Sequence, residues 1–163
     1  MILKNLRRQQ IITEMIQLGA MAPDFRLPDQ NGEIVTLSQF KGKKVLLSWH
    51  PLAWTSVCTD QMRALDRNVE RFAEKNTVVL GLSVDPQPSK SVWARALSVK
   101  HIKILSDFVP LGEVARDYGI FSEEHGASKR ANILINEAGM VIWLKKYEIR
   151  TLPDVEEVLG KMK

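Results

Sequence analysis

A lone cysteine, Cys58, is the residue of this chain whose type and surroundings most directly suggest chemistry. It follows the stretch SWHPLAWTSV, which contains Pro51 and Thr55, and the sequence has no second cysteine for a disulfide. If Thr55 or Ser56 caps a helix, Cys58 falls in its first turn, where unpaired N–H groups favour the nucleophilic thiolate. The alternative is a packed, unreactive cysteine on an apolar helical face, and Cys58 by itself does not decide between the two.

The spacing of the residues before Cys58 narrows the chemistry. Thr55 stands three positions earlier, so the loop has the pattern T-x-x-C where a dithiol redox motif would have C-x-x-C. Replacing the first sulfur by a hydroxyl removes the internal disulfide and leaves a group that can hold an oxygen atom. Pro51 lacks an N–H and can cover the sulfur with a rigid apolar ring. Together these residues predict one nucleophilic sulfur in a site for an oxygen-containing substrate.

The elements on either side of loop 51–55 must position these residues. Residues 43–49, KKVLLSW, include a short continuous apolar run, typical of a strand buried on both faces of a sheet. After the loop, apolar or weakly polar residues recur at spacings of four, three, four and three, which places them on one helical face. These residues are Cys58, Met62, Leu65, Val69 and Phe72. The sequence therefore predicts a strand, a loop and a helix, with Cys58 where the helix begins.

The rest of the chain continues the alternation of strands and helices. We expect a hairpin over 22–40 with its turn at 29–32, strands over 77–84 and 102–105, a helix over 89–99 capped by Ser89, and a short helix over 112–119 ending at Gly119. We also expect a hairpin over 131–146 and a last helix within 151–162, with Thr151 or Asp154 near its cap and Pro153 in its first turn.

This order predicts an α/β protein with a thioredoxin-like fold: a central mixed β-sheet flanked by helices, with an N-terminal β-hairpin. Residues 1–18 are predicted to be an N-terminal extension and residues 19–163 the thioredoxin-like domain. Residues 1–14 are either an upstream start or part of a short amphipathic helix through Leu6, Ile11, Met15 and Leu18.

Composition limits the class of protein. The chain has 163 residues, of which 45% are apolar and 26% charged, as in one soluble globular domain. No apolar stretch approaches the roughly 18 residues of a membrane span, and the basic N-terminus lacks the apolar core of a secretory signal. The net charge of +4 is scattered in short clusters without a nucleic-acid-reading motif. We therefore expect a cytoplasmic protein that binds neither nucleic acid nor membrane, and one cysteine agrees with a reducing compartment.

The pattern P-x-x-x-T-x-x-C resembles the active-site motif of the peroxiredoxins, the alkyl hydroperoxide reductase and thiol-specific antioxidant family. Further segments are similar to that family over about residues 19–146: GAMAPDFRLPDQNGEIVTLSQFKGKKVLLSWHP, SVDPQPSKSVW, ILSDFVPLGEVARDYGIF and KRANILIN. In the last of these, Arg130 precedes an apolar strand and corresponds to the catalytic arginine of the family.

The resemblance implies a thiol-dependent peroxidase that reduces hydrogen peroxide or organic hydroperoxides. The Cys58 thiolate would attack the peroxide and become a sulfenic acid, and Arg130 would stabilise the thiolate and the leaving oxygen. Thr55 would hold the peroxide in line, Pro51 would exclude water, and Gln61 would orient the arginine at a position where many relatives have a carboxylate. No cofactor or metal is expected, because His50, His101 and His125 lack metal-ligand spacing with Cys58 and are interpreted as ordinary surface or core histidines.

A single cysteine determines how the catalytic cycle must end. Because no resolving cysteine exists, the chain looks like the one-cysteine type, recycled by an external thiol: a thioredoxin-like or glutaredoxin-like protein, or a low-molecular-weight thiol. The resemblance also suggests a homodimer, for which apolar surface near Trp49, Trp54 or Phe121 could serve. The alternatives are a redox-sensing or chaperone-like protein of the same fold with negligible turnover, and a redox-inert scaffold. The sequence does not distinguish the preferred peroxide.

Overall fold

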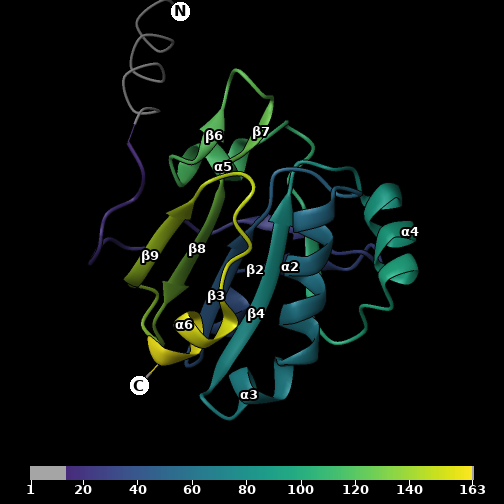
Figure 1. Cartoon of the computed structure of the whole chain (residues 1–163). Helices are drawn as coiled ribbons and strands as arrows, with labels where there is room; N and C mark the ends of the chain where they lie inside the picture. The colour runs from purple at the N-terminus through teal and green to yellow at the C-terminus, as the bar shows by residue number, and fades with distance from the viewer. Residues whose placement is uncertain (1–13, 163) are drawn as a thin grey trace, which may run out of the picture.

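The centre of the computed structural model, which describes residues 14–162, is a five-stranded sheet in the order β5-β4-β3-β8-β9 (Figure 1). β3 pairs in parallel with β4 and β4 with β5, whereas β8 pairs antiparallel with β3 and β9 with β8. The predicted parallel strands and closing hairpin are therefore both confirmed. The strands are β3 (Lys44–Trp49), β4 (Thr77–Ser83), β5 (Lys103–Ser106), β8 (Arg130–Ile135) and β9 (Val141–Tyr147).

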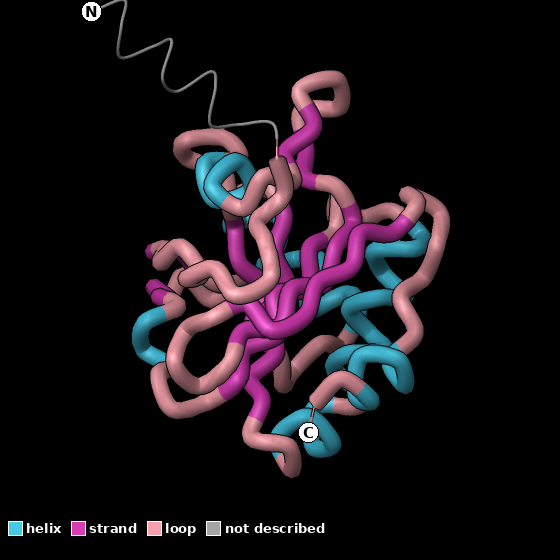
Figure 2. Tube along the Cα trace, turned by 90° about the vertical axis from the view of Figure 1, so that its left-hand side faces the viewer, coloured by secondary structure: helices cyan, strands magenta, loops and turns pink. Residues whose placement is uncertain are grey.

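Helices cover one face of this sheet, and Figure 2 shows the strands in the middle of the molecule with helices on either side. The covering helices are α2 (Ser56–Arg67), α3 (Val69–Ala73), α4 (Gln87–Leu97) and α6 (Val155–Gly160). The apolar face predicted for residues 58–72 packs against this face of the sheet. It belongs to two helices and not to one, because α2 ends at Arg67. Val69, expected to be on the same continuous helix as Cys58, is instead the first residue of α3.

The opposite face is covered by α5 (Glu113–Asp117) and by the N-terminal hairpin of β1 (Arg26–Pro28) and β2 (Ile34–Thr36). The turn of this hairpin is anchored by Asp29, whose buried carboxylate accepts from the backbone N–H groups of Asn31 and Glu33 and from Lys103 Nζ at 3.1 Å. The Gln30 side chain donates to the carbonyl oxygen of Ile102, just before β5, and accepts from the backbone N–H of Ile104 within β5. These contacts attach the predicted hairpin to the edge of the sheet. A short 3-10 helix, η1 (Ser38–Phe40), follows it.

One predicted helix start is wrong. Helix α4 begins at Gln87, with Pro86 as its N-cap residue, because Pro88 lacks an N–H and fits a first turn. Ser89 is therefore inside the helix, and its hydroxyl accepts a hydrogen bond from Trp54 Nε1 at 3.0 Å. The predicted cap of the last helix is confirmed at Asp154, whose carboxylate accepts from the backbone N–H of Glu156. Pro153, expected in the first turn, instead precedes the helix.

The structure adds a short hairpin that the sequence did not predict, formed by β6 (Phe121–Ser122) and β7 (Ala127–Ser128). It lies beside α5 at the end of the molecule to which the arrow of β4 points (Figure 1). Near the start of the described residues, the backbone N–H of Ile16 donates to the carbonyl oxygen of Tyr118, and that of Gly19 donates to the carbonyl oxygen of Val141. Leu6 and Ile11 of the alternative N-terminal helix lie outside the described residues, and Met15 and Leu18 are not helical. None of the helices within residues 14–162 is long and apolar enough to cross a membrane.

Candidate active site

Cys58 lies in the first turn of α2, as predicted. Thr55 is the N-cap residue, with extended backbone angles of φ −91° and ψ 153°, and the helix runs on from Ser56. Trp54, just before the cap, has a φ of +69°, a left-handed value that is uncommon for a bulky residue and that reverses the chain between strand and helix. The sulfur therefore lies at the carboxyl end of β3, where backbone N–H groups of the helix start are directed outward.

The Thr55 side chain does not cap the helix. Its hydroxyl donates a hydrogen bond of 2.7 Å to the carbonyl oxygen of Leu52, and the side chain is exposed. Because the hydroxyl proton is engaged in the loop, its oxygen remains an acceptor for a group that carries its own proton. Thr55 is therefore the N-cap residue, as predicted, but its side chain bonds to the preceding loop and not to the helix.

Arg130 extends from the first position of β8 to the sulfur of Cys58, with an Nη1–Sγ distance of 3.5 Å. The guanidinium is nearly fully buried and is held from two sides. Its Nε and Nη2 donate to the carbonyl oxygen of Ile149 at 3.2 and 2.8 Å, and Nη1 also donates to Gln61 Oε1. A fixed positive charge beside the sulfur stabilises the thiolate by Coulomb attraction, more strongly in the interior than in water.

Gln61 lies one turn after Cys58 on the same helix and connects Arg130 to β3. Its amide nitrogen donates to Ser48 Oγ at 2.8 Å and to the carbonyl oxygen of Trp49 at 3.3 Å, while its oxygen accepts from the arginine. A glutamate could accept from Arg130 but could not donate to the strand. The neutral amide therefore orients the guanidinium without placing a negative charge near the sulfur.

Cys58 itself has no exposed surface, and it packs in the apolar cluster that contains Ala53, Met62 and Trp93. Pro51 is also buried in the loop that precedes the helix. Burial alone would fit the alternative of an unreactive packed cysteine. A hydrogen-bonded guanidinium at the sulfur does not fit it, because an apolar side chain gains nothing from a buried cation that must be desolvated.

Sequence reasoning missed a second buried cation. Lys90 of α4 is fully buried, and its Nζ donates to the carbonyl oxygen of Leu105 at 2.9 Å and lies 3.3 Å from Nε2 of the equally buried His50. His50 was interpreted only as an ordinary surface or core residue. The signal was the helical period, since Lys90 precedes the buried Trp93 by three residues and Ala94 by four, which places it on the core-facing side.

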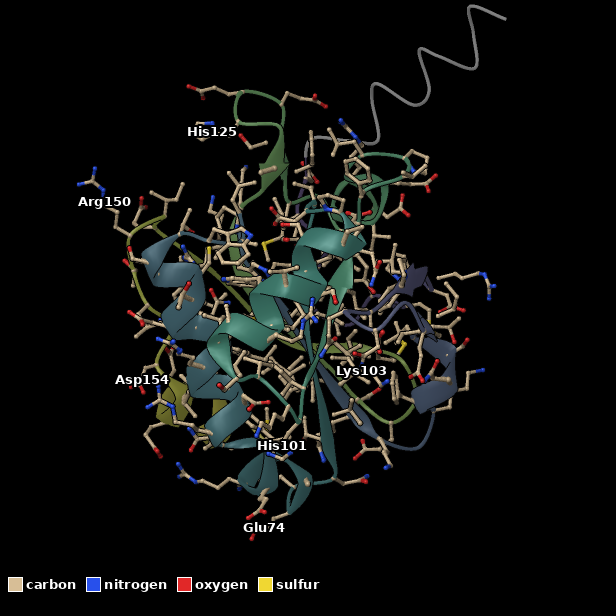
Figure 3. All side chains as sticks on the ribbon, turned by 90° about the vertical axis from the view of Figure 1, so that its right-hand side faces the viewer. Glu74, His101, Lys103, His125, Arg150 and Asp154 are labelled. Atoms are coloured by element: carbon tan, nitrogen blue, oxygen red, sulfur yellow. The ribbon has the colours of Figure 1, made fainter. Side chains whose placement is uncertain are left out.

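Other candidate groups lie away from this site. His101 and His125 are exposed at opposite ends of the molecule (Figure 3). Within residues 14–162 no cluster of three or more histidine, cysteine, aspartate or glutamate side chains could hold a metal ion. A cavity of about 410 Å³ lined by Leu37, Lys43 and Asn136 lies where β3 begins, at the end opposite to Cys58.

Comparisons with known proteins agree with this geometry. The sequence model of the AhpC/TSA family matches residues 18–144. Alkyl hydroperoxide reductase E of Mycobacterium tuberculosis is 37% identical over 128 residues, which cover 78% of this chain and 83% of that protein. A peroxiredoxin of Thermoplasma volcanium is 34% identical over 152 residues, covering 91% of this chain and 74% of that protein.

A solved structure has the same fold. The reduced 2-Cys peroxiredoxin of Plasmodium vivax superimposes with a TM-score of 0.79 at 31% identity, covering 88% of this chain and 79% of that one. The predicted thioredoxin-like fold, with its mixed sheet, flanking helices and N-terminal hairpin, is therefore confirmed. With one cysteine in its whole sequence, the chain belongs to the AhpC/TSA family as a peroxiredoxin of the one-cysteine type, a thiol-dependent peroxidase.

Proposed function

We propose that Cys58 is the peroxidatic residue of this enzyme and reduces hydrogen peroxide or organic hydroperoxides. The thiolate attacks one peroxide oxygen, an S–O bond forms, and the O–O bond breaks. The sulfur becomes a sulfenic acid, and the leaving oxygen takes up a proton and departs as water or an alcohol. The observation that carries the proposal is the 3.5 Å contact between Arg130 Nη1 and Cys58 Sγ.

Arg130 is proposed to act on both partners of the reaction. Negative charge moves from the sulfur to the leaving oxygen as the bond breaks, and a guanidinium has several donors with which to follow it. Its bonds to Gln61 and Ile149 fix the guanidinium plane before the substrate arrives, so little reorganisation is needed during the reaction.

Thr55 and Pro51 are proposed to shape the peroxide site. Since the Thr55 hydroxyl donates to Leu52, its oxygen is suited to accept a hydrogen bond from the O–H of a hydroperoxide. That contact would hold the O–O bond in line with the sulfur. The buried ring of Pro51 has no N–H to attract water, which supports a role in keeping the loop dry.

Recycling of the enzyme needs a thiol from outside the chain. The first equivalent of thiol displaces water from the Cys58 sulfenic acid and forms a mixed disulfide. A second thiol then releases the Cys58 thiolate and leaves with the first as a disulfide. The partner is proposed to be a thioredoxin-like or glutaredoxin-like protein or a small thiol in the cytoplasm, where disulfides are kept reduced.

A homodimer is proposed through apolar surface beside the site. Leu52 and Trp54 follow β3 and are about half exposed, and an apolar loop that includes Phe108 and Val109 follows β5. β3 and β5 end at the same edge of the parallel part of the sheet, so both loops are at the active-site end. Trp49, suggested from the sequence for this surface, is fully buried and cannot take part.

The decisive experiment compares peroxide consumption by the wild type and by Cys58→Ser, with dithiothreitol as the reductant. We expect the wild type to consume many equivalents of hydrogen peroxide or cumene hydroperoxide, and the serine variant none above the thiol blank. The redox-sensing alternative predicts instead one equivalent of oxidation without efficient turnover, and the scaffold alternative predicts that both proteins behave alike. Mass spectrometry of the oxidised wild type should place the added oxygen on Cys58.

A further inference from the structure

The loop between β3 and α2 is fastened to the neighbouring strand by a carboxylate. β3 and β4 run in parallel with Trp49 opposite Leu82, so the loop that follows β3 begins beside the residues that follow β4. One of these residues is Asp85, whose Oδ2 accepts a hydrogen bond of 2.8 Å from the backbone N–H of Ala53. Ala53 lies between Pro51 and Thr55, so this bond reaches the middle of the loop that carries the proposed peroxide site.

The backbone of this loop depends on such contacts. Trp54 follows Ala53 and has a φ of +69°, a left-handed value that a bulky residue keeps only where its surroundings impose it. A second contact comes from α4, because Trp54 Nε1 donates to Ser89 Oγ at 3.0 Å. Asp85 and Ser89 therefore hold the loop from two different elements of the fold.

The peptide group between Leu52 and Ala53 takes part in two hydrogen bonds. Its N–H donates to Asp85, and its carbonyl oxygen, which belongs to Leu52, accepts from the Thr55 hydroxyl at 2.7 Å. Because a peptide group is planar, a contact that fixes its N–H also fixes the direction of its carbonyl oxygen. The two bonds also polarise the peptide group in the same sense, so each strengthens the other. A continuous path thus runs from Asp85 through one peptide group to Thr55.

The carboxylate of Asp85 is itself held in place. The hydroxyl of Ser83, the last residue of β4, is buried and donates to the same Oδ2 that accepts from Ala53. Across residues 14–162, no lysine, arginine or histidine nitrogen lies within ion-pair distance of this carboxylate. Its negative charge is therefore available to strengthen the bond from Ala53, as in other hydrogen bonds to an ionised acceptor.

We propose that Asp85 is a positioning residue that orients the Thr55 hydroxyl for the peroxide. With the hydroxyl proton held by the Leu52 carbonyl oxygen, the Thr55 oxygen can only accept, and it accepts from the O–H of the substrate. The site therefore favours peroxides that bring a proton, hydrogen peroxide and hydroperoxides, over peroxides without an O–H. This inference rests on the proposed function, because it concerns the way in which Thr55 holds the peroxide.

The test is a double-mutant cycle on the second-order rate constant of Cys58 oxidation by hydrogen peroxide. It is measured by stopped-flow tryptophan fluorescence on full-length protein shown to be folded by near-ultraviolet circular dichroism. We expect Thr55→Val to lower the rate constant about tenfold and Asp85→Ala about fivefold, because the hydroxyl loses its fixed acceptor. The double variant should lose only about tenfold in total, because Asp85 then has no hydroxyl to orient, whereas independent effects would multiply to about fiftyfold.

Two further variants serve as controls. Asp85→Asn keeps an oxygen that can accept from Ala53, so its rate constant should stay within about threefold of the wild type. Asp60→Ala removes an exposed carboxylate of α2 and changes the net charge by the same amount as Asp85→Ala, and it should follow the wild type. A general loosening of the loop would also slow the Thr55→Val protein, so the cycle separates that effect from the orientation of the hydroxyl.

Each alternative outcome has a distinct meaning. An Asp85→Ala rate constant equal to that of the wild type, or losses that multiply in the double variant, overturns the role of Asp85 while leaving the peroxidase proposal intact. A loss in Asp60→Ala as large as in Asp85→Ala would assign the effect to net charge and would also overturn it. A wild type that reacts slowly with every peroxide contradicts the proposed function itself.

A second measurement leaves Asp85 in place and does not depend on the folding of Asp85→Ala. If the two bonds of the peptide group reinforce each other, removal of the Thr55 hydroxyl must weaken the bond from Ala53 to Asp85. In ¹⁵N-labelled protein, the amide proton of Ala53 should resonate at higher field in Thr55→Val than in the wild type. Thr55→Ser keeps the hydroxyl and should match the wild type. The same Ala53 resonance in all three proteins would show that Asp85 and Thr55 are uncoupled and would overturn the proposal.

Discussion

Replacing Arg130 by methionine removes the guanidinium that contacts the Cys58 sulfur, and its effect can be worked out from the geometry. Methionine is shorter than arginine but fills the space of the buried stem, so the main change is the loss of the charge and of the donors to Cys58, Gln61 and Ile149. A hydrogen bond to a charged group contributes about 1.5–3 kcal/mol. A preorganised donor to developing charge contributes about 3–4 kcal/mol in enzymes that have been tested.

At about 1.4 kcal/mol for each factor of ten, these figures predict a loss of about 10–10³ in the second-order rate constant of Cys58 oxidation. The loss should appear at all peroxide concentrations, because the interaction strengthens as the O–O bond breaks. Arg130→Lys should fall between the two proteins. A lysine restores the charge but cannot bond Ile149 and Gln61 in the same fork.

The assay is stopped-flow tryptophan fluorescence with hydrogen peroxide in excess, on protein shown by near-ultraviolet circular dichroism to be folded. A rate constant for Arg130→Met within threefold of the wild type would refute the reasoning, since a buried guanidinium 3.5 Å from the sulfur would then have no part in the reaction. A loss equal in Arg130→Lys and Arg130→Met would mean that hydrogen-bond geometry, and not charge, carries the effect.

Three further predictions concern Thr55, Gln61 and Lys90. Thr55→Val should lower the rate constant of peroxide oxidation about tenfold by removing the hydroxyl acceptor, whereas Thr55→Ser should stay within threefold of the wild type in the same assay. Gln61→Leu should lower it by about tenfold, since Arg130 loses a partner that orients it, and thermal melts should show a lower Tm because Ser48 is left unpaired. Lys90→Met should unfold at a higher urea concentration than the wild type at pH 7, because the wild type must bury Lys90. The pKa of Lys90 is about 7 in the folded protein and 10.5 ordinarily, so between these pH values the unfolded chain binds one more proton than the folded chain. The free energy of unfolding of the wild type therefore rises with pH in this range. The difference in unfolding free energy between the variant and the wild type should therefore shrink by about 3 kcal/mol from pH 7 to pH 9.5, and a constant difference would contradict the assignment.

Local signals in the sequence were sufficient for most of the fold. The apolar run before Trp49 predicted β3 because a strand buried on both faces has no polar positions to interrupt it. The start of α4 was misplaced because Ser89 is a good capping residue, and nothing local shows that its hydroxyl is taken by Trp54. The β6–β7 hairpin was missed because its two-residue strands carry no periodicity.

The residues of the site also differed in how far local sequence signals could identify them. Cys58 could be placed from neighbouring residues, because a helix start is local information. Arg130 is 72 positions away and was assigned only through resemblance to a family. Lys90 was not assigned, since a lysine on an amphipathic helix is ordinarily solvated, and its burial follows from the packing of α4 onto β5. Contacts between distant segments depend on sheet order, which single-sequence patterns fix only in outline.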